Sequence, residues 1–126
     1  MAIKIRRVVV PEELAAAVAA QAAATVANDA AAGRYLDARA AEAIAIALGR
    51  AETLRPFTRY ERIACARLGH HYLVKVKFVG RSGELTLQNR WSHGADGHWR
   101  IIECDDLGLK SPWKKPAKPM LVNANA

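Results

Sequence analysis

The stretch HYLVKVKFVGRSGELTLQNRW, residues 71–91, alternates apolar and polar side chains on both sides of a short link that contains two glycines. A period of two is that of a β-strand, whose successive side chains point to opposite faces of a sheet. The link, Gly-Arg-Ser-Gly at 80–83, has the composition of a hairpin turn. We therefore expect two antiparallel strands, at 70–80 and 83–91, with one apolar face and one polar face.

Two further segments continue this pattern on either side of the hairpin. FTRYERIACARLG (57–69) precedes it and HWRIIECD (98–105) follows it, and both contain several β-prone residues. The connections are short, with Gly69 before one strand and SHGADG (92–97) before the last. Because links of this length join antiparallel neighbours, the pattern predicts a four-stranded meander.

The segment before the sheet has helical periodicity instead, and nearly half of its residues are alanine. We expect a first helix from Pro11 to about Ala31, ended by Gly33, and a second from Asp37 to about Arg50. Two N-terminal alanine-rich helices followed by four strands indicate the α+β class, with the helices packed on one face of a curved antiparallel sheet. The first helix carries no charge over its middle, so either both of its sides are covered within one subunit or, as we favour, one side meets another subunit.

The net charge of +7, from 19 basic and 12 acidic residues, is confined to the two ends of the chain. Residues 11–107 contain twelve of each kind, so the body is formally neutral. The start, IKIRRVVV at 3–10, is an extra strand-like segment. Three prolines and four lysines without periodicity predict a basic Pro- and Lys-rich arm at 108–126, after a single domain at 1–107.

The rest of the composition argues against several classes of protein. Two cysteines, Cys65 and Cys104, suit a reducing compartment and have no zinc-binding spacing. Neither the basic start nor the alanine-rich stretch is apolar enough for a secretion signal or a membrane span. The four histidines also lack a metal-binding spacing. We expect a soluble cytoplasmic protein with no metal and no cofactor.

Four pieces of the chain, taken in order, resemble the NTF2-like superfamily, the α+β cone also called cystatin-like or SnoaL-like. They are NDAAAGRYLDARAAEA (28–43), ALGRAETLRP (47–56), the hairpin at 71–91 and DGHWRII (96–102), within a resemblance that spans residues 14–107. It implies a concave sheet face that lies under the helices and lines a pocket. The segment before Phe57 is too short for the usual third helix, so the chain resembles the compact members, many of them without known catalysis.

The acids at the end of the last strand are the candidate catalytic groups. Alternation from Trp99 and Ile101 places Glu103 and Asp105 on one face, which the resemblance makes the concave one. Relatives that are isomerases or dehydratases use an acid there as general base, and burial would raise the pKa of Asp105 toward a useful range. The alternative is a strand that ends near Ile102 and leaves both acids exposed. The residues expected to line the pocket are Tyr35, Tyr72, Val74, Val76, Phe78, Leu87, Asn89, Trp91, Trp99, Ile101, Glu103 and Asp105.

Three functions from different classes agree with these patterns. We favour a non-catalytic NTF2-like binding or assembly protein, a homodimer that holds a small apolar ligand or a protein partner. The second is a small isomerase-, dehydratase- or hydrolase-like enzyme that uses Asp105. The third is a nucleic-acid-associated subunit that binds through its basic termini. In the arm, Trp113 with Lys114 and Lys115 is the expected partner-binding element, since aromatic anchors are typical of interfaces.

Overall fold

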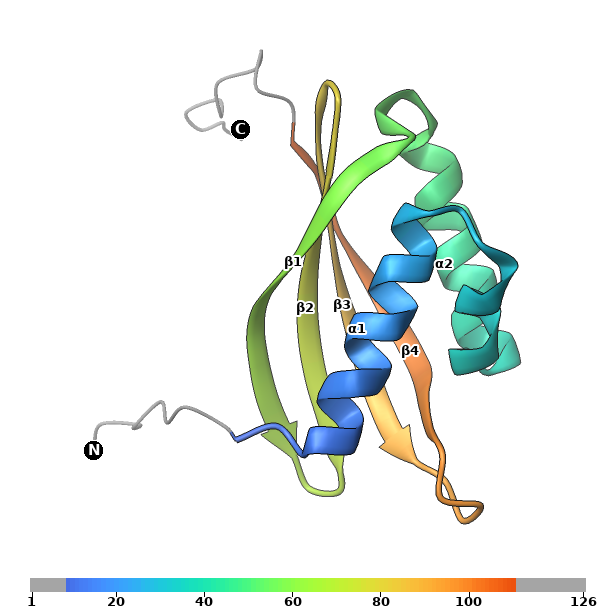
Figure 1. Cartoon of the computed structure of the whole chain (residues 1–126), viewed down its shortest axis with the longest axis vertical. Helices are drawn as coiled ribbons and strands as arrows, with labels where there is room; N and C mark the ends of the chain where they lie inside the picture. Colours follow the sequence, from blue (N-terminus) through green and yellow to red (C-terminus); the bar gives the residue numbers. More distant parts are fainter. Residues whose placement is uncertain (1–8, 111–126) are drawn as a thin grey trace, which may run out of the picture.

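The computed structural model describes residues 9–110, in which helices lie over one face of a four-stranded sheet (Figure 1). The helical part consists of α1 (Glu12–Val26), the 3-10 helix η1 (Ala30–Tyr35), α2 (Ala38–Arg50) and the 3-10 helix η2 (Glu52–Leu54). The sheet consists of β1 (Phe57–Leu68), β2 (His71–Gly80), β3 (Gly83–His93) and β4 (Trp99–Lys110). The α+β class and the four-stranded antiparallel sheet predicted from the sequence are therefore confirmed.

The strands form a meander in which each pairs with its neighbours in the sequence, in the order β1-β2-β3-β4. Two of the tight connections use left-handed backbone, with a φ of +59° at Gly69 and +85° at Gly97. Glycine adopts this conformation without steric cost. β4 continues to Lys110, which pairs with Glu84, so the strand extends past residue 107, where we expected the arm to begin.

The first helix is shorter than the sequence predicts. α1 ends at Val26, and Asn28 has a left-handed φ of +56°, a conformation that asparagine tolerates at the end of a helix. Asp29 then begins η1 by accepting a hydrogen bond from the Ala31 amide at 2.9 Å, so Gly33 lies inside η1 and does not end α1. The predicted cap of the second helix is confirmed, because the Asp37 side chain accepts from the amide at the third helical position at 2.9 Å.

The core lies between the helices and the face of the sheet that they cover (Figure 1). Leu14 and Val18 of α1 and Ile44 of α2 are at most 5% exposed. They pack against alternate residues of β2 and β3, as the period of two requires. At the end of β2, Gly80 lets η2 approach the sheet, because a side chain there would collide with the backbone carbonyl of Leu54.

Residues 9 and 10, at the N-terminal end of the described segment, have no regular secondary structure. Val9 is exposed and Val10 packs against the core, while most of the strand-like segment expected at 3–10 lies outside the described residues. Between residues 9 and 110, no helix is long and apolar enough to cross a membrane.

Candidate functional site

Most of the residues expected to line a pocket are packed into the core. Eight of the twelve are at most 8% exposed, on the helix-covered face of the sheet: Tyr72, Val74, Val76, Phe78, Leu87, Asn89, Trp91 and Ile101. Tyr35 and Trp99 are half-buried and pack at the edge of the same cluster. Ten of the twelve thus lie on the helix side, but eight of them pack between the helices and the sheet and do not line an open pocket.

The two acids of that set, Glu103 and Asp105, lie on the opposite face. Trp91 of β3 is paired with Ile101, but the preceding residue of β3, Arg90, is paired with Glu103, so β4 contains one extra residue at this point. Such a β-bulge shifts the alternation by one, so the side chains from Glu103 to Asp106 change face, up to a second register shift between Asp106 and Leu109. The alternation that put both acids on the helix side is wrong for this reason. Both acids are exposed, as the alternative held, but the strand does not end near Ile102.

The shift brings Asp106 to the helix side instead of Asp105. Its carboxylate is 17% exposed and accepts a hydrogen bond from Arg50 at the end of α2, with 3.0 Å between Nη1 and Oδ2. The other carboxylate oxygen accepts from the Gly108 amide at 2.7 Å. Asp106 thus ties α2 to β4, and both of its oxygens are already engaged.

The two free thiols lie on the helix side at opposite edges of the sheet. The register places Cys65, Val74, Asn89 and Cys104 in one row across the four strands. Three strand spacings of about 4.8 Å separate the cysteines, too far for a disulfide within one chain. Burial, with the charges of Asp105 and Asp106, raises the pKa of the Cys104 thiol to about 12. A thiol with so high a pKa is a poor nucleophile at neutral pH.

Asn89, in the middle of this row, is a polar side chain inside the apolar core. It is 2% exposed, and its Oδ1 atom has no hydrogen-bond donor among the described residues. A buried carbonyl without a donor costs about 1–3 kcal/mol relative to the hydrated group. Asn89 is therefore a polar exception within an otherwise apolar part of the core.

A separate cleft of about 440 Å³ opens between the first turns of α1, η1 and the β3–β4 turn. Its aromatic lining comes from Tyr35 and Trp99, and its charged lining from Glu13, Arg34 and Arg100. These residues come from three distant stretches of the sequence. Only Tyr35 and Trp99 were expected at a site, because no local motif joins the others to them.

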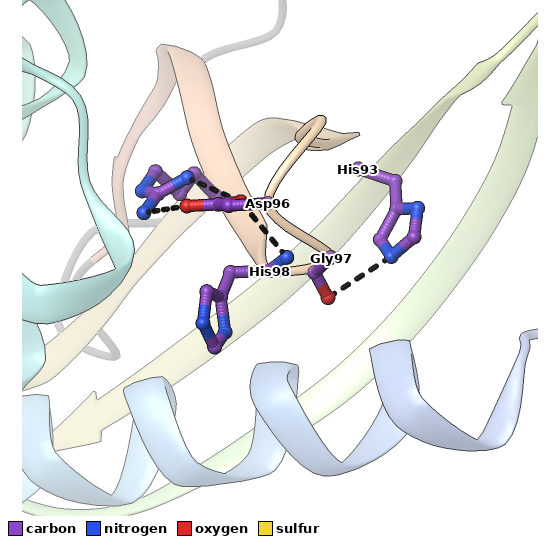
Figure 2. A network of polar contacts seen from close by, with 5 residues as sticks. His93, Asp96, Gly97 and His98 are labelled. Carbon is purple, nitrogen blue, oxygen red and sulfur yellow. Dashed lines mark hydrogen bonds and ion pairs between the residues drawn. The ribbon is translucent and has the colours of Figure 1, made fainter.

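The β3–β4 turn beside this cleft is held by a polar network (Figure 2). Arg100 donates to both carboxylate oxygens of Asp96, at 2.8 and 3.2 Å, and the His98 amide donates to one of them at 3.1 Å. The Arg100 guanidinium and the amide hold the pKa of the Asp96 carboxyl well below its usual range. The His93 ring contacts the Gly97 carbonyl at 3.0 Å, so both sides of the turn are fastened.

The histidines do not gather with acids or thiols. Among the described residues there is no group of three or more His, Cys, Asp and Glu side chains that could hold a metal ion. In Figure 2 His93 and His98 extend from different parts of the turn. The His93 ring lies near the Gly97 carbonyl, whereas His98 lines the cleft.

The second face of the sheet, which we call the outer face, is not covered by any described helix (Figure 1). Ile63, Leu68 and Leu107 are 46 to 48% exposed there. On the same face, Leu73 and Val79 of β2 are half-buried. Large apolar side chains therefore occur on β1, β2 and β4 of a face that residues 9–110 leave uncovered.

Charged residues on the outer face are mostly paired across neighbouring strands. Lys77 lies 3.2 Å from Glu61 and 3.6 Å from Glu84, which keeps the pKa of its ammonium group raised. Arg90 lies 3.1 Å from Glu103. These pairs are exposed, so they contribute little stability and mainly neutralise the face.

The chain matches no family model, no curated protein and no solved structure. The NTF2-like resemblance, which rests on the order of four sequence pieces, stays a prediction. The expected partner-binding residues Trp113, Lys114 and Lys115 lie outside the described residues.

Proposed function

We propose that the chain is a non-catalytic, NTF2-like assembly protein that works as a homodimer joined through the outer face of its sheet. The observation that carries this proposal is the set of apolar side chains on that face, the exposed Ile63, Leu68 and Leu107 together with the half-buried Leu73. Apolar side chains on an uncovered sheet face are typical of a surface that is buried in an assembly. Free thiols suit a reducing compartment, and we place the protein in the cytoplasm.

The area of the outer face agrees with that of a stable dimer. The four strands have 10 to 12 residues each. At about 3.3 Å per residue and about 4.8 Å between strands, such a face covers roughly 650 Å². Two copies face to face would bury roughly 1,300 Å² in total, against the 1,200–2,000 Å² or so of specific interfaces. The face is large enough, though without much excess, so every apolar side chain on it should matter.

Charge complementarity favours a second copy over a different partner. Lys75, Gln88 and Asp105 lie in one row on the outer face, and neither Lys75 nor Asp105 forms an ion pair within residues 9–110. A two-fold axis that runs along the strands between β2 and β3 would keep all four strands in contact, with β1 of each copy over β4 of the other. Lys75 would then lie one strand spacing from the partner's Asp105, twice in each dimer.

The catalytic alternative loses its main support. Asp105 lies on the exposed outer face, away from the buried aromatic residues that were expected to surround it. Asp106, which takes its place on the helix side, has both oxygens engaged. The small apolar ligand loses support as well, because the residues expected to hold it are packed against the helices. Assembly through the outer face is the function that remains best supported.

The test is the oligomeric state of matched variants, measured by sedimentation velocity over a range of concentrations. Leu73→Glu places a charge in the middle of the outer face, and we expect it to weaken the dimer at least tenfold. The control is Ile46→Glu, which adds the same charge at a 60% exposed position of α2 and should leave the dimer unchanged. A wild-type chain that sediments as a monomer at micromolar concentration, or a dimer that only Ile46→Glu weakens, would refute the proposal.

A further inference from the structure

We propose that the cleft between α1, η1 and the β3–β4 turn binds a small organic carboxylate with a flat apolar body. The cleft is on the helix side of the molecule, so this inference is independent of the dimer proposed above. Its volume of about 440 Å³ falls in the lower part of the range of about 300–1,000 Å³ that small-molecule sites occupy.

The apolar lining of the cleft is fixed in place by packing on its inner side. The Tyr35 ring lies 6.2 Å from Trp91, and the Trp99 ring lies 5.8 Å from Tyr72 and 4.8 Å from His93, between ring centroids. Aromatic side chains held in this way lose little further freedom when a flat group packs on them. The cleft is therefore prepared for an apolar body on this side.

Arg34 supplies the positive charge for the carboxylate. It is exposed at the mouth of the cleft and forms no ion pair with any residue between 9 and 110. The other arginine, Arg100, is already bound through two hydrogen bonds to Asp96, and that pair has no net charge. A free guanidinium binds a carboxylate through two parallel hydrogen bonds.

Glu13 and His98 also line the cleft, and Glu13 limits the negative charge that a ligand can carry. Glu13 lines the cleft from α1, and no ion pair joins it to Arg34, so its negative charge is also uncompensated among the described residues. Figure 2 shows the His98 ring extending from the turn toward α1, and it lines the same cleft. A cleft that contains one unpaired guanidinium and one unpaired carboxylate admits a monoanion more readily than a phosphate dianion, because Glu13 repels the second charge.

The test uses phenylacetate as the probe, titrated to about 10 mM and followed by calorimetry. Arg34→Gln should weaken binding about tenfold, since hydrogen bonds between charged groups contribute about 1.5–3 kcal/mol. The control Arg39→Gln removes an exposed arginine of α2 that does not line the cleft, and should change the affinity less than twofold. Phenethylamine and phenyl phosphate carry the same ring on a cation and a dianion, and both should bind more weakly than phenylacetate.

A second measurement on the unaltered chain keeps the inference testable if Arg34→Gln does not fold. In ¹⁵N-labelled protein, phenylacetate should shift the indole N–H resonance of Trp99, which lines the cleft, more than that of the buried Trp91. Absence of binding at about 10 mM, equal binding of either control compound, or an unchanged affinity in Arg34→Gln would overturn the inference. Leu73→Glu, which tests the dimer, should leave phenylacetate binding intact, so the two proposals can fail separately.

Discussion

The two faces of the sheet are built from the same strands and have different properties. On the helix-covered face, alternate residues of β2 and β3 are 0 to 8% exposed and form the core. On the outer face, the residues between them are half-buried, with apolar and charged side chains mixed. A shift of one position along a strand thus separates a side chain that stabilises the fold from one that is available for association.

The largest expected effect comes from removing the Trp91 side chain from the helix-covered face. Trp91→Ala removes the largest fully buried side chain and should lower the free energy of unfolding by about 3–5 kcal/mol. Its neighbour Ser92 points to the outer face, and Ser92→Ala should change stability by less than about 0.5 kcal/mol. Urea unfolding of both variants measures the contrast, and similar losses in the two would contradict the assignment of faces.

The second effect concerns β4, where the bulge places Asp106 on the helix-covered face and Asp105 on the outer face. Asp106→Ala removes the hydrogen bonds from Arg50 and the Gly108 amide, and should cost about 1–2 kcal/mol of unfolding free energy. Asp105→Ala, whose carboxylate forms no hydrogen bond among the described residues, should cost less and only through the dimer. Thermal and urea unfolding of the two single variants decide between the registers, because a straight strand would give the reverse result.

A third, smaller effect concerns the one polar residue in the buried row of the sheet. Asn89→Val removes a carbonyl oxygen that has no donor among the described residues and adds a side chain suited to a strand. We expect an increase of about 1 kcal/mol in the free energy of unfolding. Gln21→Met, at a buried amide that donates to Thr25 at 3.2 Å, should give no such gain. A loss of stability in Asn89→Val would mean that this amide has a partner or a role of its own.

The smallest effect appears only in alkali and concerns the Cys104 thiol. Its folded-state pKa of about 12 lies above the ordinary value of 9.0, so the native fold favours the neutral thiol. That contribution is complete below pH 9 and is lost as the pH rises toward 12, because the unfolded chain then ionises first. Cys104→Ala should therefore lose less thermal stability than the wild type between pH 8 and 11. Parallel pH profiles for the two proteins would disprove this.

The regular parts of the sheet could be predicted from the sequence, because an unbroken strand keeps its period. Strands expected at 70–80 and 83–91 are observed as His71–Gly80 and Gly83–His93, and their buried residues were identified correctly. The face of Asp105 could not be predicted, because one extra residue in β4 leaves no mark in the composition. The end of α1 was signalled by Asn28, yet the alanines beyond it continue the helical composition.

The candidate cleft could not be predicted from the sequence, for a different reason. Glu13, Arg34 and Trp99 belong to α1, η1 and β4, and none of them stands in a motif that the others complete. Their proximity depends on how α1 and η1 pack beside the β3–β4 turn. The dimer surface could be predicted in part. Alternation identified the residues of the outer face, but only the structure shows that the described helices lie on the other face.

The central claim, that the outer face joins two copies, is tested most directly by an isotope-filtered NOE experiment on a mixture of labelled and unlabelled chains. Contacts between copies should involve the methyl groups of Ile63, Leu73 and Leu107, which lie on three strands of the outer face. The competing surface is the outward side of α1, whose exposed residues are mostly alanine. Contacts confined to Ala16 and Ala20 of α1, or no contacts between copies at all, would contradict the account.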